Sequence, residues 1–208
     1  DLGCYGAKNV KTPNVDRLAS QGIRFTDTHA IAATSTPSRY SILTGEYAWR
    51  RPDTDIAPGD AGMIIRPEQY TMADMFRSQG YRTCAIGKWH LGIGAETGTQ
   101  DWNAPLPASL SDIGFDYHYI MAATADRVPC VFIENGNVAN YDPSAPIHVS
   151  YKKNFPGEPT GKNNPELLYN LKSTPGCGHD QSIVNGIGRI GYMKGGGKAL
   201  WKDENIAD

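Results

Sequence analysis

Twice along the chain, a helical segment ends at a glycine and leads directly into a short apolar strand. The first helix is predicted over Pro13–Gln21, is stopped by Gly22 and is followed by a strand over residues 23–26. The second helix is predicted over residues 72–79, after a threonine cap, and precedes a strand over residues 81–86. Helices that alternate with strands are typical of an α/β layered sheet that is mostly parallel. Ligands of such sheets bind beyond the carboxyl ends of the strands.

The second half of the chain predicts less regular structure. Residues 92–113 are rich in Gly, Pro, Asn and Asp, which indicates a loop. Residues 128–140 predict a β-hairpin whose two-residue turn is Asn135-Gly136. Residues 141–177 have weak periodicity and predict a long surface region that shapes a substrate pocket.

Composition excludes several classes of protein. The formal net charge of -2 and the isoelectric point of about 6.2 show no polybasic footprint, so nucleic acid is not expected as a partner. No apolar run approaches the roughly 18 residues of a membrane span. The four cysteines form no C-x-x-C pair, so we expect neither a zinc site nor a dense disulfide framework, and we expect them free or only partly paired.

Residues 35–45, Ser-Thr-Pro-Ser-Arg-Tyr-Ser-Ile-Leu-Thr-Gly, combine a hydroxyl group with a helix start and a cation. Proline is favoured in the first turn of a helix, and Gly45 follows a helical segment predicted over residues 40–44. Ser35 is therefore expected at a helix N-terminus, where N–H groups and the dipole attract an anion. Arg39, one turn later, faces the same side and adds a fixed positive charge. This combination suits an oxyanionic ester.

The same stretch resembles the sulfatase signature: Cys or Ser, any residue, Pro, Ser, Arg, three residues, Leu or Met, Thr, Gly. Residues 87–92, Gly-Lys-Trp-His-Leu-Gly, resemble the second signature of that family, and residues 2–6 and 12–19 look like sulfatase N-terminal sequence. The close resemblance covers residues 1–92. Residues 114–208 look like the less widely shared middle region of bacterial sulfatases that act on sulfated glycans.

The resemblance implies that residues 1–208 are part of a single sulfatase catalytic domain. Its fold would be α/β and alkaline-phosphatase-like, a layered sheet with helices on both faces, incomplete at both ends. Residues 1–92 would form the core with both signatures, and residues 93–208 an insertion-rich region around the substrate pocket. In the family, an Asp pair that binds calcium lies just upstream of this sequence, and a second metal-ligand pair and a further Lys lie downstream. We therefore expect an internal fragment that is inactive alone.

The resemblance also implies a chemistry for the two signatures. A serine hydroxyl is a poor nucleophile, and the sequence places no His-Asp pair beside Ser35. In the family, a maturing enzyme, here of the serine type, oxidises this residue to formylglycine, whose aldehyde is hydrated to a diol. One hydroxyl of the diol attacks the sulfur of a sulfate ester and the alcohol leaves; the second hydroxyl then collapses to the aldehyde and expels sulfate. Calcium would bind the oxygen at position 35, with most of its ligands outside this chain, and Arg39 would orient that oxygen. Lys88 would contact the sulfate, and His90 would hold an oxygen or assist proton transfer. Because Lys88 and His90 are two residues apart, they are expected to face the same side of an extended segment.

The expected substrate is a sulfated carbohydrate or an aryl sulfate, and the expected location is the periplasm or outside the cell. His179 is a second candidate for substrate binding, although a loop histidine without that role is the simpler interpretation. Asp126 and Arg127 would bind a sugar hydroxyl or carboxylate, or form a surface ion pair. A calcium site that does not need outside ligands would draw on the following carboxylates: Asp101, Asp112, Asp116 and Asp126.

Each site residue also has a plain structural interpretation. Ser35 alone reads as a helix cap, Lys88 as a surface charge and His90 as a core histidine, while Trp89 is expected to pack. Structural roles are predicted for the remaining histidines, His29, His118 and His148. The alternative activity is hydrolysis of phosphomonoesters or phosphodiesters by a related enzyme of the alkaline-phosphatase-like superfamily, and a third possibility is a chain without activity of its own.

Overall fold

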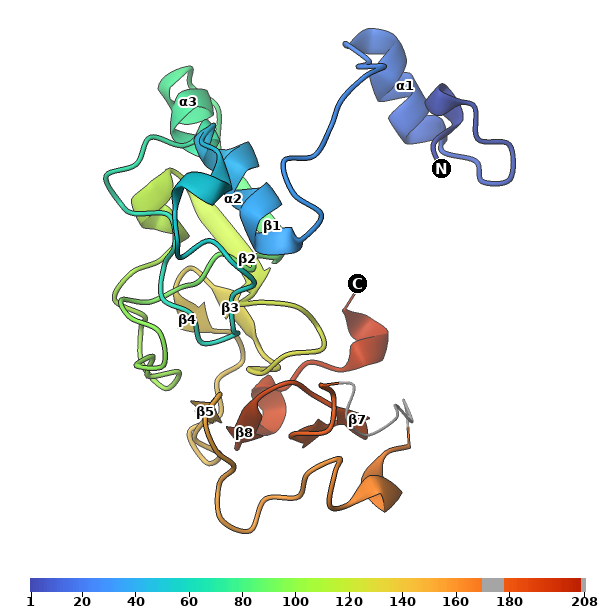
Figure 1. Ribbon diagram of the computed structural model, residues 1–208. Helices are drawn as coiled ribbons and strands as arrows, with labels where there is room; N and C mark the ends of the chain where they lie inside the picture. Colours follow the sequence, from blue (N-terminus) through green and yellow to red (C-terminus); the bar gives the residue numbers. More distant parts are fainter. Residues whose placement is uncertain (170–177, 207–208) are drawn as a thin grey trace. The chain divides into compact units, whose positions relative to one another are not determined.

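The computed structural model describes residues 1–169 and 178–206, which divide into two compact units. The first unit, residues 1–30, contains a 3₁₀ turn at Gly3–Tyr5 and helix α1 at Pro13–Gln21 (Figure 1). The helix has the predicted bounds. Its Asp16 carboxylate accepts a hydrogen bond of 2.7 Å from the backbone N–H of Cys4, which attaches the N-terminal turn to the helix.

The strand predicted over residues 23–26 is wrong, because this segment has no regular structure. Ile23 is 84% exposed and Phe25 is 67% exposed. A strand is stabilised by hydrogen bonds to a neighbouring strand, and none of the described strands pairs with this segment.

The second unit, which begins at residue 31, is built around a sheet of four strands in the order β1-β2-β3-β4 (Figure 1). The strands are β1 at Cys84–Lys88, β2 at Tyr117–Met121, β3 at Phe132–Glu134 and β4 at Asn137–Val138. The first pair is parallel and the other two are antiparallel. The sheet is therefore mixed, and the prediction of a mostly parallel sheet is wrong for these strands. Only the connection from β1 to β2 is long enough for a parallel crossover, whereas β3 and β4 are joined by a tight turn.

The predicted hairpin is confirmed, with Asn135 at φ 46° and Gly136 at φ 81° in its turn. Positive φ at both central residues is the geometry that Asn-Gly favours in two-residue hairpins. The backbone N–H of Gly136 donates to Nε2 of His118 over 2.9 Å, and His118 is buried. This contact supports the structural role predicted for that histidine.

Two helices lie beside β1 (Figure 1) and contact each other: α2 at Ser35–Thr44 and α3 at Met72–Ser78. Helix α2 ends before Gly45, whose φ is 71°. Helix α3 is capped by Thr71, which shares a reciprocal capping box with Asp74. The strand that follows begins three residues later than predicted and ends at Lys88. The backbone N–H of Thr83, just before β1, donates to the Asp116 side chain, and no ladder pair precedes Cys84.

The remaining described elements are short. Strand β5 at His148–Ser150 pairs with β8 at Tyr192–Lys194, and β6 at Ile183–Val184 pairs with β7 at Ile187–Gly188. Short 3₁₀ turns lie at Ala48–Arg50, Leu110–Ile113, Pro165–Leu167, Gly197–Ala199 and Asp203–Asn205. No helix in the described part of the chain has the length and apolar character needed to cross a membrane.

The described cysteines, Cys4, Cys84 and Cys130, are free, as expected. The prediction for Cys177 lies outside the described residues. The core of the second unit lies around β2 and β3, whose paired residues Ile120 and Ile133 are both buried. The parallel pairing of β1 with β2 places the carboxyl ends of these two strands beside each other.

Candidate active site

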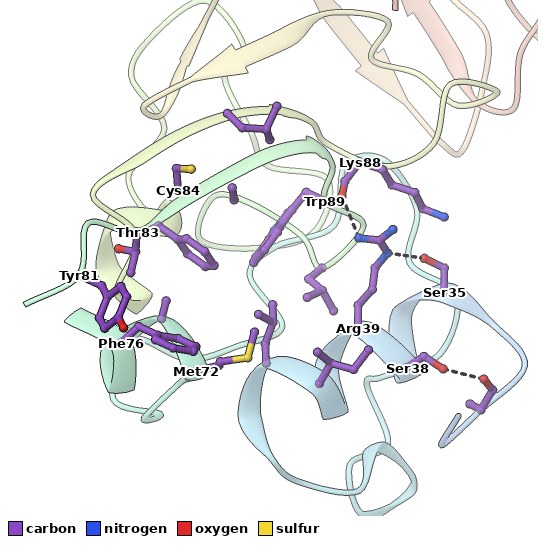
Figure 2. A pocket seen from close by; sticks show the side chains of 18 of the residues that line it. Ser35, Ser38, Arg39, Met72, Phe76, Tyr81, Thr83, Cys84, Lys88 and Trp89 are labelled. Carbon is purple, nitrogen blue, oxygen red and sulfur yellow. Dashed lines mark hydrogen bonds between the residues drawn. The ribbon is translucent and has the colours of Figure 1, made fainter. Parts of the chain in front are cut away.

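Ser35 is the first residue of α2, so the helix begins five residues earlier than the predicted segment and has this serine at its N-terminus. Its hydroxyl Oγ accepts a hydrogen bond of 3.0 Å from Nε of Arg39, one turn along the helix. The Nη1 atom of the same guanidinium donates to the backbone carbonyl of Lys88 over 2.9 Å (Figure 2). Arg39 thus connects the start of α2 with the carboxyl end of β1.

Lys88 is the last residue of β1 and is half-buried. Its pKa is lowered by burial and by the positive charges of Arg39 and Arg127, while the charge of Asp126 acts in the opposite direction. Several cations therefore gather near the end of this strand. Their mutual repulsion is relieved when an anion binds among them.

His90 lies two residues beyond the end of β1 and is buried. Its backbone N–H donates to the Ala122 carbonyl over 3.0 Å, so the segment still follows β2. However, its φ is 61°, in the left-handed region that residues other than glycine rarely adopt. The expectation that Lys88 and His90 face one side of an extended segment is therefore wrong at His90.

The imidazole of His90 has a polar partner at each nitrogen. Nδ1 lies 3.2 Å from Oγ of Ser35, and Nε2 lies 2.9 Å from the carbonyl oxygen of Ala57. A carbonyl only accepts hydrogen bonds, so we assign the proton of the neutral ring to Nε2, which leaves Nδ1 as an acceptor. Since Ser35 already accepts from Arg39, its hydroxyl hydrogen is available to Nδ1.

Burial lowers the pKa of His90, and the nearby charges of Lys88, Arg127 and Arg39 lower it further. The hydrogen bond to the Ala57 carbonyl acts in the opposite direction but does not outweigh burial. The neutral imidazole is therefore favoured at neutral pH. Ser35 therefore has a neighbouring histidine, His90, which is oriented by a backbone carbonyl. The sequence had indicated no His-Asp pair beside this serine.

His179 lies beside the loop that follows β2. Its Nε2 is 2.9 Å from Oδ2 of Asp126, and Nη1 of Arg127 is 3.3 Å from the other oxygen of that carboxylate. Burial raises the pKa of Asp126, but the hydrogen bonds from Thr124 and His179 and the charge of Arg127 outweigh it and lower the pKa. The ion pair predicted as one alternative for Asp126 and Arg127 is present, and the charges of both residues act on Lys88.

A groove of about 890 Å³ begins at Ser35, Arg39 and Lys88 and continues over apolar side chains. Figure 2 shows these three residues together on one side of the groove, apart from Met72 and Phe76. Other groove residues come from α2, α3 and β1 or lie near them, including Ile42, Leu43, Ala73, Ile86 and Phe115. Trp89 is buried, and its ring packs edge-on against Phe115, which agrees with the packing role expected for it.

The described residues do not supply a metal-ligating set. In residues 1–169 and 178–206, no three side chains of His, Cys, Asp or Glu gather closely enough to hold an ion. The four carboxylates considered as an alternative calcium site, at positions 101, 112, 116 and 126, therefore do not form one.

Two residues of this site were not singled out in the sequence: Thr36 and Ala57. Thr36 occupies the position of the first signature at which any residue is accepted, and Ala57 lies in a segment without helix or strand. No local pattern indicates that an alanine carbonyl meets a histidine 33 residues away.

Comparisons with known proteins identify the family of this chain. A sequence profile described as Sulfatase matches residues 1–137. The chain is 53% identical over all 208 residues to an N-acetylgalactosamine-6-O-sulfatase from Bacteroides thetaiotaomicron, of which it covers 40%. It is 37% identical over 131 residues to the steryl-sulfatase of Homo sapiens, a match that covers 60% of this chain and 21% of that protein. A solved sulfatase structure from work on glycosaminoglycan metabolism in B. thetaiotaomicron matches with a TM-score of 0.89 and 53% identity, over 100% of this chain and 42% of that one.

These similarities first define a class, the proteins with an alkaline-phosphatase-like α/β fold, and confirm the predicted fold class. Within that class, the chain belongs to the sulfatase family. The named relatives are sulfatases, which hydrolyse sulfuric esters. The chain spans less than half of the length of each of these relatives.

Proposed function

We propose that this chain carries part of the active site of a sulfuric ester hydrolase, with Ser35, Arg39, Lys88 and His90 around the reacting sulfate. The observation that supports this proposal most strongly is the position of the Ser35 hydroxyl, 3.0 Å from Nε of Arg39 and 3.2 Å from Nδ1 of His90. The Arg39 guanidinium is a charged donor, and the neutral imidazole of His90 is an acceptor. This is the environment that a hydroxyl needs to lose a proton as it attacks.

Ser35 is the position at which, in this proposal, a serine-type maturing enzyme produces formylglycine, whose hydrated aldehyde supplies the nucleophilic hydroxyl. Arg39 donates to the oxygen at this position and keeps it at the helix N-terminus. His90, neutral and acceptor at Nδ1, takes the proton from that oxygen. Lys88 places its ammonium group against the sulfate oxygens, where negative charge grows as the ester bond breaks.

The calcium ion implied by the family would take, from the described residues, only the oxygen at position 35. The described side chains do not otherwise fit a metal site, and none of the steps above depends on the ion. The four residues around the sulfate act through direct hydrogen bonds and charge.

The proposed substrate is a sulfated carbohydrate, because a relative that aligns with the whole chain is named an N-acetylgalactosamine-6-O-sulfatase. His179, hydrogen-bonded to Asp126 beside the loop after β2, is the proposed contact to the sugar. Sulfated glycans are extracellular polymers, so we place the protein in the periplasm or outside the cell. Fractionation of the source cells tests this location.

A substrate panel tests the activity. The full-length protein, matured in a host with a serine-type maturing enzyme, is incubated with N-acetylgalactosamine 6-sulfate, an aryl sulfate and the corresponding aryl phosphate. Release of sulfate at rates well above release of phosphate is expected. Faster phosphate release would favour the phosphoesterase alternative, and no release from any ester would contradict hydrolysis altogether.

A further inference from the structure

We propose that Thr36 is the positioning residue that fixes the orientation and tautomer of His90. This inference rests on the proposed function, because it says which residue holds His90 in the orientation in which it would take a proton. Thr36 acts through the backbone, because its hydroxyl binds the carbonyl of His90 and the N–H of Ala57.

The Thr36 hydroxyl connects the two chain segments that hold His90. Oγ1 of Thr36 donates to the backbone carbonyl of His90 over 3.0 Å and accepts from the backbone N–H of Ala57 over 3.2 Å. The carbonyl of the same alanine lies 2.9 Å from Nε2 of His90. One hydroxyl therefore binds both the residue that carries the imidazole and the residue that receives its N–H.

The position of Thr36 in the sequence makes this connection useful for the site. Its neighbour Ser35 faces Nδ1 of His90, and Thr36 controls Nε2 through Ala57. The two ring nitrogens are thus held by consecutive residues at the start of α2. Sites built on helices are more precise than sites on loops, so this arrangement holds the imidazole relative to the Ser35 hydroxyl.

Both contacts of the Thr36 hydroxyl act at backbone positions that lie outside the helices and strands, at His90 and at Ala57. His90 has φ 61°, and a left-handed residue that is not glycine persists only when its surroundings hold it. Ala57 lies in residues 51–71, which contain no helix or strand, so its carbonyl direction depends on local hydrogen bonds. The Thr36 side chain is 0% exposed, so water cannot replace its hydroxyl if that group is removed.

Thr36→Val tests the proposal, because valine keeps the shape and removes the hydroxyl. The tautomer of His90 is read by long-range ¹H–¹⁵N correlation in histidine-labelled full-length protein, made in a host that leaves position 35 as serine and assigned with His90→Gln. We expect wild type to carry the proton on Nε2 and Thr36→Val to show a changed ratio of tautomers. In matured protein, kcat should fall about 10- to 100-fold, with KM changed less than about threefold.

Two control variants separate positioning from stability. Thr36→Ser retains the hydroxyl and should keep the wild-type tautomer. Thr83→Val removes a matched hydroxyl, which donates to the Gly114 carbonyl over 2.6 Å and accepts from the Asp116 N–H over 3.1 Å. It should lower stability and leave the tautomer of His90 unchanged.

A folded Thr36→Val protein with the wild-type tautomer and kcat would overturn the proposal, and so would a Thr36→Ser protein that changed the tautomer as much as Thr36→Val. If valine prevented folding, Thr36→Ala would be judged by the same criteria. Absence of sulfate release by wild type would refute the proposed function only, since the tautomer measurement needs no turnover.

Discussion

Replacement of Arg39 by lysine or by alanine separates the two contributions of its guanidinium. Nε binds the Ser35 hydroxyl at 3.0 Å and Nη1 binds the Lys88 carbonyl at 2.9 Å, so two nitrogens of one rigid group serve two elements. A lysine ammonium keeps the charge but is a single point and does not reproduce this fork. Alanine removes both the charge and the fork.

The expected magnitudes follow from these contacts. Loss of one preorganised charge stabiliser typically lowers the rate about 10²- to 10³-fold, or about 2.7–4 kcal/mol, so Arg39→Ala should lower kcat/KM by that amount. Arg39→Lys should lower it by roughly 10-fold to 100-fold, because the charge remains without the second hydrogen bond. The Lys88 carbonyl loses its donor in Arg39→Ala, which should cost about 1 kcal/mol of stability.

The assay is initial-rate kinetics on an aryl sulfate with matured full-length protein, accompanied by urea unfolding. Arg66→Ala is the matched control, because Arg66 is exposed and is not among the residues that line the groove; its kcat/KM should equal that of wild type. A kcat/KM within about twofold of wild type for Arg39→Ala would refute the assignment of its guanidinium to the reacting oxygen.

Three further predictions concern the neighbouring residues. Lys88→Ala should lower kcat/KM about 10²- to 10³-fold with little change in the urea midpoint, and near-normal turnover would mean that the second signature is only structural. Burial lowers the pKa of both His90 and His118. Folding therefore favours the neutral forms of these histidines. The stability that they contribute is present above the unfolded pKa of about 6.5 and is lost as the pH falls through the lowered folded pKa. A urea midpoint that does not decrease from about pH 7 to pH 5 would contradict this sign. Thr71→Ala removes the α3 cap and a 2.8 Å bond to the Ile113 carbonyl, and should cost about 1–2 kcal/mol in urea unfolding. An unchanged midpoint would show that the cap contributes no stability.

The features predicted correctly from the sequence are local ones. Helix α1 has its predicted bounds, with Pro13 in its first turn and Gly22 after its end, and the Asn135-Gly136 hairpin forms as predicted, because helix ends and turns depend on neighbouring residues. The strand predicted over residues 23–26 does not form, because a strand needs a partner that lies elsewhere. The mixed character of the sheet was also not predicted. The direction in which two strands pair depends on the connection between them and not on the residues of either strand alone.

In the candidate site, some residues were indicated by the sequence and others were not. The two signatures identified Ser35, Arg39 and His90, whose mutual contacts the structure describes. Thr36 and Ala57 were not identified, because their contacts with His90 span 54 and 33 residues and involve backbone atoms. Backbone atoms are common to all residues and leave no signal in a sequence pattern.

The central claim is that the oxygen at position 35 becomes the nucleophile only after oxidation of the serine. The most direct measurement is mass spectrometry of the tryptic peptide that carries Ser35, combined with sulfate release by the same preparation. In a host with a serine-type maturing enzyme, the peptide should lack two hydrogen atoms relative to serine, and specific activity should rise in proportion to the modified fraction. In a host without that enzyme, the peptide should contain intact serine and the protein should release no sulfate. Full turnover by a preparation in which Ser35 is wholly unmodified would contradict the claim.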